Sequence, residues 1–225
     1  MKDIMTELTK RALLTGLTAA SLLTTAPAWA QGRNTIQQFV TPPKFSAQDQ
    51  TRIERAVAYL QSLGTGGGRF EQTDYKGRTT AGNWWLQRPG KIRFEYDAPY
   101  SLVVVSDGKT VNTWDPRLKA FNQYPLNATP LSLFLSKQIR LDQGVIVTEV
   151  TPTTDGFRLK ARDRRRDVEG SILMTFIERG NALQLGEWTV TDQQGKGTRV
   201  KLVTFDRNAA VRPDLFILKK PKGAN

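Results

Sequence analysis

The residue types that most often carry catalysis are missing or scattered in this sequence. It has no Cys and no His, which excludes a thiolate nucleophile, a Ser-His-Asp triad and an imidazole metal site. Hydrolysis by two carboxylates needs two acids in one pocket, but the 21 Asp and Glu residues are spread along the chain. We therefore expect no enzyme activity, no metal site and no cofactor.

The side chain that most needs an explanation is Arg88, in the aromatic stretch WWLQRPGKIRFEY at residues 84–96. Pro89 has no amide hydrogen to donate to a strand ladder, and Gly90 permits a positive backbone angle. Pro89-Gly90 therefore predicts a turn between two strands. A long cation would then lie at the end of an unusually apolar hairpin.

Strand alternation divides this hairpin into two different faces. One face carries charged side chains and is predicted to be exposed to water, namely Lys91, Arg93 and Glu95. The other face is aromatic and aliphatic and shares the parity of Arg88; it consists of Trp84, Leu86, Ile92, Phe94 and Tyr96. Ordinary core packing would explain this apolar face, and so would the wall of a cavity.

Two helices are predicted beside the strands that position this hairpin. Apolar residues recur at helical spacing over 48–63, and GTGGG at 64–68 predicts a loop or hinge. A second, short helix is predicted over 130–136. It is apolar on nearly all sides, with Leu131, Phe134 and Leu135, so we expect it to cover something apolar, as a lid.

The rest of the pattern has period two and short turns. Asp107-Gly108 predicts a tight hairpin turn, and the end of the chain at 211–223 predicts a strand or short edge. In total, ten or eleven consecutive antiparallel strands are expected. The fold class is therefore mainly β (α+β), with one strongly curved sheet, closed or nearly so.

The termini and the charge indicate the compartment. Residues 1–30 have a basic start, a short apolar core and a small-x-small cleavage pattern, as in a signal peptide; residues 31–47 predict a flexible arm and 48–225 one domain. The net charge is +12, but an exported protein meets little nucleic acid. The basic run at 160–169 is either a solvated loop or an anion site, and the sequence leaves both open.

A barrel wider than about eight strands leaves an interior space. A lidded space lined by Trp, Phe, Tyr, Ile and Leu suits a long apolar ligand. Each methylene kept from water contributes roughly 0.8 kcal/mol, so exposing one sixteen-carbon chain costs on the order of 12 kcal/mol. A protein that moves such chains through water must cover them.

Several short motifs together resemble the periplasmic outer-membrane lipoprotein carriers, the LolA-type family. The resemblance covers about residues 48–223. Its motifs are Phe70-Glu71-Gln72, Gly82-x-Trp84-x-Leu86, Arg88-Pro89-Gly90, Arg93-Phe94-Glu95-Tyr96-x-x-Pro99, Ser106-Asp107-Gly108-Lys109, Trp114-Asp115-Pro116, ATPLSLFL at 128–135 and FILKKPKG at 216–223.

The resemblance implies an incomplete β-barrel in the periplasm, whose mouth is covered by helices. It implies a monomer that receives lipoproteins from an inner-membrane lipoprotein-releasing transporter and, in some bacteria, passes them to an outer-membrane receptor. Arg88 would be a latch that hydrogen-bonds lid carbonyls. The cavity for acyl chains would be lined by Trp84, Leu86, Ile92, Phe94, Tyr96, Leu131, Phe134 and Leu135. The alternative is a lipid-binding or envelope-stress sensing module of the same fold.

Overall fold

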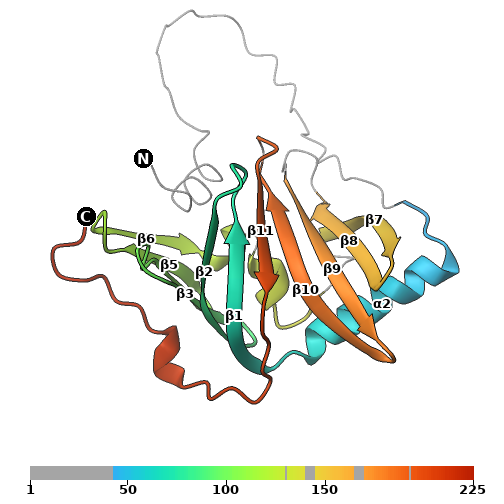
Figure 1. Ribbon diagram of the computed structural model, residues 1–225, viewed down its shortest axis with the longest axis horizontal. Helices are drawn as coiled ribbons and strands as arrows, with labels where there is room; N and C mark the ends of the chain where they lie inside the picture. The colour runs from blue at the N-terminus through green and yellow to red at the C-terminus, as the bar shows by residue number, and fades with distance from the viewer. Residues whose placement is uncertain (1–42, 130, 140–144, 165–169, 193) are drawn as a thin grey trace, which may run out of the picture.

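The structure is a computed structural model that describes residues 43–129, 131–139, 145–164, 170–192 and 194–225. Its centre is one antiparallel sheet of 11 strands in the order β6-β5-β4-β3-β2-β1-β11-β10-β9-β8-β7. Successive strands are neighbours except β6 and β7, which stand at the two edges, and β11 returns to pair with β1 (Figure 1). The predicted fold class is confirmed.

The strands are short and joined mainly by tight turns. The first half of the sheet contains β1 (Thr65–Thr73), β2 (Thr79–Gln87), β3 (Lys91–Tyr96), β4 (Val103–Asp107), β5 (Thr110–Asp115) and β6 (Ala120–Pro125). The second half contains β7 (Val145–Thr153), β8 (Gly156–Asp163), β9 (Ser171–Arg179), β10 (Ala182–Thr191) and β11 (Gly197–Leu202).

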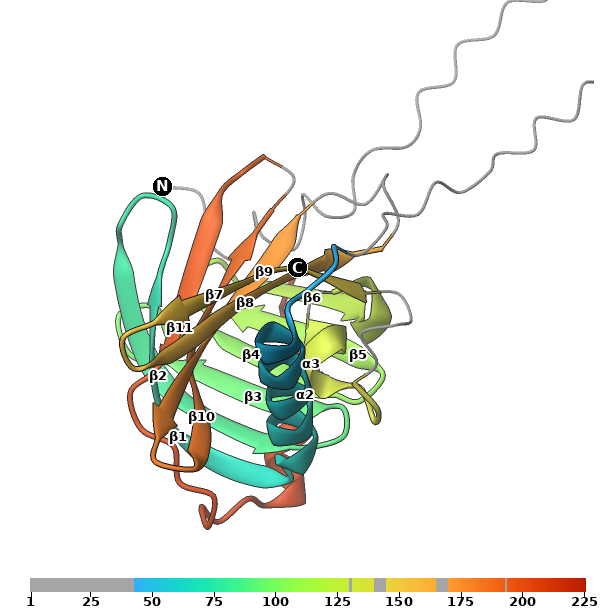
Figure 2. The same ribbon diagram turned by 90° about the vertical axis from the view of Figure 1, so that its right-hand side faces the viewer.

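Two helices lie in the concave side of this curved sheet (Figure 2). Helix α2 (Ala47–Ser62) begins one residue earlier than predicted, because the Ser46 hydroxyl accepts the Asp49 amide hydrogen as a cap. Helix α3 (Leu131–Leu135) follows the 3-10 turn η1 (Leu126–Ala128). None of the described helices is long and apolar enough to cross a membrane.

One hydrophobic core joins the concave face of the sheet to α2. The helix contributes Ile53, Ala56, Tyr59 and Leu60, at the spacing that places them on one side. Strand β3 contributes its alternate residues, with Ile92, Phe94 and Tyr96 buried. The concave face is therefore apolar in both halves of the chain.

Residues 65–68 of the glycine run at 64–68 belong to a strand, which corrects the predicted loop. Residues from Thr65 onward belong to β1 and pair with β2. A Cβ atom at Gly68 would collide with the carbonyl oxygen of Thr204, in the segment that leaves β11. Glycine here therefore allows two backbones to approach closely. Because glycine-rich stretches are also typical of loops, the sequence predicted a loop at this place.

The C-terminal segment also differs from the prediction. Residues 211–223 form no strand; they contain the 3-10 turn η2 (Pro213–Phe216), which packs against β3 and β4. Arg93 donates to the Leu215 carbonyl at 2.9 Å, and its side chain is only 14% exposed. The face of β3 predicted to be wet is therefore partly covered by this C-terminal strap.

Several expectations concern residues outside the described ranges. The signal peptide at 1–30, residues 31–42 of the arm at 31–47, and residues 165–169 of the basic run belong to this group. They stay predictions.

Candidate functional site

Arg88 lies where β2 ends and connects two helices from different parts of the chain. Its guanidinium donates through one nitrogen to the Leu60 carbonyl, in α2, and through the other to the Ser136 carbonyl, 2.6 Å away, directly after α3. Carbonyls at helix C-termini lack the regular intrahelical partner, so they are available acceptors with partial negative charge. The Leu60 carbonyl also accepts the amide of the capping Leu63, at 3.4 Å. One side chain therefore holds both helices to the rim of the sheet.

The turn that follows Arg88 makes a second contact with α3. The Gly90 amide donates to the Leu135 carbonyl at 2.9 Å, and the buried Ser106 hydroxyl donates to the Gly90 carbonyl at 2.6 Å. Gly90 has φ +84°, and a Cβ there would lie 2.7 Å from the Cα of Gly108. The turns at Pro89-Gly90 and Asp107-Gly108 thus lie against each other, and glycine is required at residue 90.

The Arg88 guanidinium is half-buried and its charge is balanced by dipoles. Burial lowers the pKa of Arg88, although an arginine starts so high that it stays charged at physiological pH. Among the described residues no carboxylate forms an ion pair with it, and its Nε has no acceptor. A half-buried cation held by carbonyls at two helix ends depends on the helices staying in place.

The predicted apolar face of the hairpin lies in the core. Trp84, Leu86, Ile92, Phe94 and Tyr96 are all buried. Phe70 packs edge-on against both Phe94 and Tyr96, with ring centroids 5.1 and 5.0 Å apart. The Tyr96 hydroxyl donates to the Gln72 side chain at 2.7 Å, and burial raises its pKa.

A cavity lies further along the sheet, under both helices. This lid cavity has a volume of about 320 Å³ and is mainly apolar. It is lined by Ala56, Val57 and Leu60 of α2, by Ser132, Phe134, Ser136, Gln138 and Ile139 in and after α3, and by Val145, Leu159, Ala161, Ile172 and Met174 of β7, β8 and β9.

Of the eight residues expected to line a cavity, only Phe134 lines the lid cavity. Trp84, Leu86 and Ile92 border a smaller space of about 10 Å³, the hairpin void, which Phe134 also borders. Phe94, Tyr96 and Leu135 belong to the core and Leu131 packs against it, but none of the four borders either space. Sequence reasoning missed the β7–β9 residues, although alternation in VIVTEV, GFRLKA and GSILMTFI offered the same signal.

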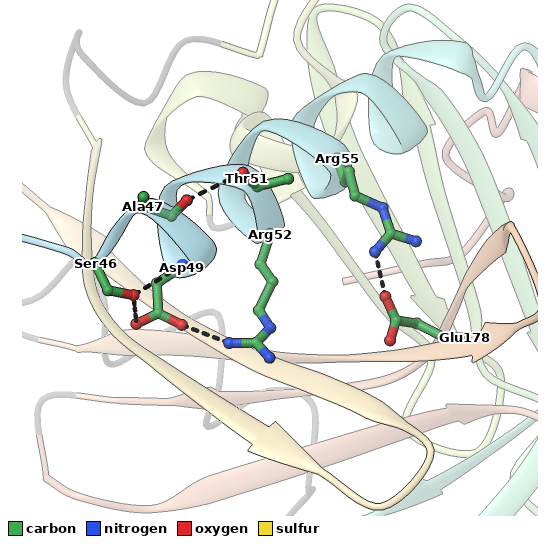
Figure 3. Close-up of polar contacts among 7 residues, drawn as sticks. All are labelled: Ser46, Ala47, Asp49, Thr51, Arg52, Arg55 and Glu178. Carbon is green, nitrogen blue, oxygen red and sulfur yellow. Dashed lines mark hydrogen bonds and ion pairs between the residues drawn. The ribbon is translucent and has the colours of Figure 1, made fainter.

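A second polar contact attaches α2 to the sheet through Arg55. Arg55 of α2 forms an ion pair with Glu178 near the end of β9 (Figure 3). In the first turn of the helix, Arg52 donates to Asp49 at 2.7 Å, and Asp49 contacts the capping Ser46. Because both partners of the Arg55 pair are about one-third exposed or more, we expect it to contribute under 1 kcal/mol.

This arrangement can enclose an apolar ligand. The helices are attached to the sheet by a few polar contacts, and the space beneath them is lined by aliphatic and aromatic side chains. Within the described residues, no group of three Asp or Glu could hold a metal ion.

Two comparisons with known proteins, with a family model and with named relatives, point to the same family. The family model described as "Outer membrane lipoprotein carrier protein LolA" matches residues 61–219. A protein of Chromohalobacter salexigens named "Outer-membrane lipoprotein carrier protein" is 30% identical, over 80% of this chain and 89% of its own. A protein of the same name from Chromobacterium violaceum is 28% identical, over 100% of this chain and 98% of its own.

Solved structures are more distant. A LolA superfamily protein from Nitrosomonas europaea has a TM-score of 0.48 and 7% identity, over 75% of this chain and 97% of its own. The Pseudomonas aeruginosa MucA/MucB complex contains a chain with a TM-score of 0.39 and 11% identity, over 77% of this chain and 62% of its own. Both scores lie below 0.5, so the assignment rests on the family model and the curated relatives. The chain belongs to the outer membrane lipoprotein carrier family, LolA.

Proposed function

We propose that this chain is a periplasmic carrier that covers the acyl chains of lipoproteins during their passage from the inner to the outer membrane. The observation that carries the proposal is the apolar lid cavity beneath two helices attached by Arg88. Exposing one long acyl chain to water costs on the order of 12 kcal/mol, and a lidded apolar cavity removes that cost without chemistry.

The proposed cycle has a closed empty state and an open loaded state. In the closed state Arg88 holds the ends of α2 and α3 against the rim of the sheet. Acyl chains that enter beneath α3 displace the helix and break these hydrogen bonds. When the cargo leaves, the closed state regains these hydrogen bonds. This gain offsets part of the free energy of cargo binding, so the cargo can be released.

The family supports lipoproteins as cargo. We extend the proposal to the partners and processing that the sequence suggested: removal of residues 1–30 on export, receipt from an inner-membrane lipoprotein-releasing transporter, and transfer as a monomer. Where an outer-membrane receptor exists, that receptor would accept the cargo.

The direct test is whether the chain keeps a lipoprotein in solution. The protein is purified from the periplasm and mixed with an acylated lipoprotein in dilute detergent, which is then removed before ultracentrifugation. We expect the lipoprotein to stay in the supernatant in a complex with the carrier. A non-acylated form of the same lipoprotein should not bind, and sedimentation of the acylated form regardless of the carrier would contradict the proposal.

A further inference from the structure

Two apolar spaces adjoin beneath the helices, and a single side chain borders both. The lid cavity lies between α2, α3 and strands β7–β9, whereas the hairpin void lies toward β2, β3 and β10. Among the described residues Phe134 of α3 is the one that lines both spaces. Its ring therefore stands at the boundary between them.

The position of this ring is set by a stacking contact with the sheet. Phe134 packs nearly parallel to Trp188 of β10, with centroids 6.0 Å apart and planes at 23°. Trp188 lines the hairpin void, while its partner across the strand pair, Met174 of β9, lines the lid cavity. The stacked rings thus lie above the strand pair where the two spaces meet.

The boundary is built from parts that can move. Phe134 and Trp188 are both only half-buried, and Phe134 belongs to a helix of five residues. Arg88 and Gly90 attach this helix to the sheet rim through the carbonyls at its C-terminal end. A displacement of α3 would therefore carry the Phe134 ring away from Trp188 and join the two spaces.

We infer that Phe134 is a partition that sets how much of an acyl chain the carrier accepts before α3 is displaced. With the ring against Trp188, a chain fills the lid cavity and its end meets Phe134. With the ring displaced, the chain continues into the hairpin void, along Leu86 and Leu185. The inference rests on the proposed function, because it assigns a specificity-determining residue to the same cavity.

Chain-length dependence of binding tests this partition. Saturated fatty acids from decanoic to stearic acid are titrated below their critical micelle concentrations against a bound fluorescent probe, N-phenylnaphthylamine. While added methylenes are buried, the affinity should rise about fourfold for each one. For the unsubstituted protein we expect this rise to stop at an intermediate length, whereas for Phe134→Ala the rise should continue to longer fatty acids.

Ile139→Ala is the matched control, because Ile139 is buried and lines the lid cavity but not the hairpin void. This substitution enlarges the lid cavity without removing the boundary. The fatty-acid length at which the affinity stops rising should therefore move by less than in Phe134→Ala. Phe134→Leu should move the limit in the same direction as Phe134→Ala, by less, and serves if the alanine variant fails to fold. An unchanged limit in the Phe134 variants, or an equal shift in Ile139→Ala, would overturn the partition. Failure of the unsubstituted protein to bind any fatty acid would instead overturn the proposed function, and the partition with it.

Discussion

At the residue scale, Arg88 is unusual because, among the described residues, its cation is stabilised by hydrogen bonds to carbonyls alone. Hydrogen bonds from a charged donor contribute roughly 1.5–3 kcal/mol each, but part of this is offset by removing the guanidinium from water. The difference is small enough for cargo to overcome. A carboxylate partner would have stabilised the cation directly. Carbonyls at two helix ends stabilise it only while both helices stay in place.

This balance predicts the behaviour of Arg88→Leu. The variant lacks the bonds that stabilise the closed state, so loading no longer has to break them. We expect acyl-chain affinity to increase about tenfold, equivalent to roughly 1.4 kcal/mol, and transfer to outer-membrane acceptors to slow accordingly. Affinity is measured by fatty-acid titration, and transfer by the movement of a loaded lipoprotein to acceptor vesicles.

Arg88→Lys is the matched control for the charge. An ammonium keeps the cation but lacks the planar fork that spans two carbonyls, so the affinity and release of this variant should lie between those of the unsubstituted chain and those of Arg88→Leu. Release by Arg88→Leu at the rate of the unsubstituted protein would contradict the latch.

Sequence alternation could place Arg88 on the apolar face, but it could not identify its partners. Leu60 lies 28 residues before Arg88 and Ser136 lies 48 residues after it, and both offer only backbone atoms. Backbone acceptors leave no trace in side-chain composition. The latch could therefore be expected from the family resemblance, whereas its geometry required the fold.

At the scale of elements, local patterns predicted the strands and helices because each follows its own period. What they could not predict is contact between distant segments. Gly68 of β1 is explained by the close approach of Thr204, and the lid cavity by β7–β9 residues that lie beneath α3. The turn after β1 is different, because its stability is determined locally.

In that turn, Asp74 organises the hairpin between β1 and β2. Its buried carboxylate accepts the amides of Lys76 and Arg78, each at 2.9 Å, and the Arg78 guanidinium at 2.8 Å. Burial opposes ionisation of Asp74, but the hydrogen bonds from Arg78 and Lys76 outweigh it and lower the pKa below its ordinary value of 3.8. The ionised carboxylate therefore stabilises the folded state.

We predict that Asp74→Asn lowers the free energy of unfolding by about 1–2 kcal/mol at neutral pH. Because the folded pKa is depressed, this contribution is present above pH 3.8 and is lost as the pH falls through the lowered folded value. Urea unfolding of both proteins across that range measures the difference. Glu71→Gln, exposed on β1, should change stability by less than about 0.5 kcal/mol, and a gap for Asp74→Asn that stays constant into acid would contradict this account.

At the scale of the whole molecule, the two faces of the curved sheet have separate roles. The concave face and the helices form the main core and both apolar spaces. On the other face, the C-terminal strap runs around the sheet and places Phe216 against β3 and β4 (Figure 1). Phe216 is 2% exposed yet lies outside the main core, with Lys91 above its ring.

This division predicts that stability and cargo binding can be changed separately. Truncating a buried Phe to Ala typically costs about 3–5 kcal/mol, and in a domain of this size 1 kcal/mol corresponds to roughly 2–4 °C in Tm. Phe216→Ala should therefore lower Tm by on the order of 10 °C, measured by circular dichroism. Ile217→Ala, at a neighbouring side chain that is 60% exposed, should change it by no more than about 2 °C.

Below its lowered Tm, Phe216→Ala should still bind acyl chains as the unsubstituted protein does. The reason is geometric: the strap contacts the charged side of β3 through Arg93, whereas Ile92 on the same strand points to the hairpin void. A fatty-acid titration at a temperature where both proteins are folded measures this. If affinity fell in proportion to stability, the strap would be part of the binding apparatus, and the separation of the two faces would be wrong.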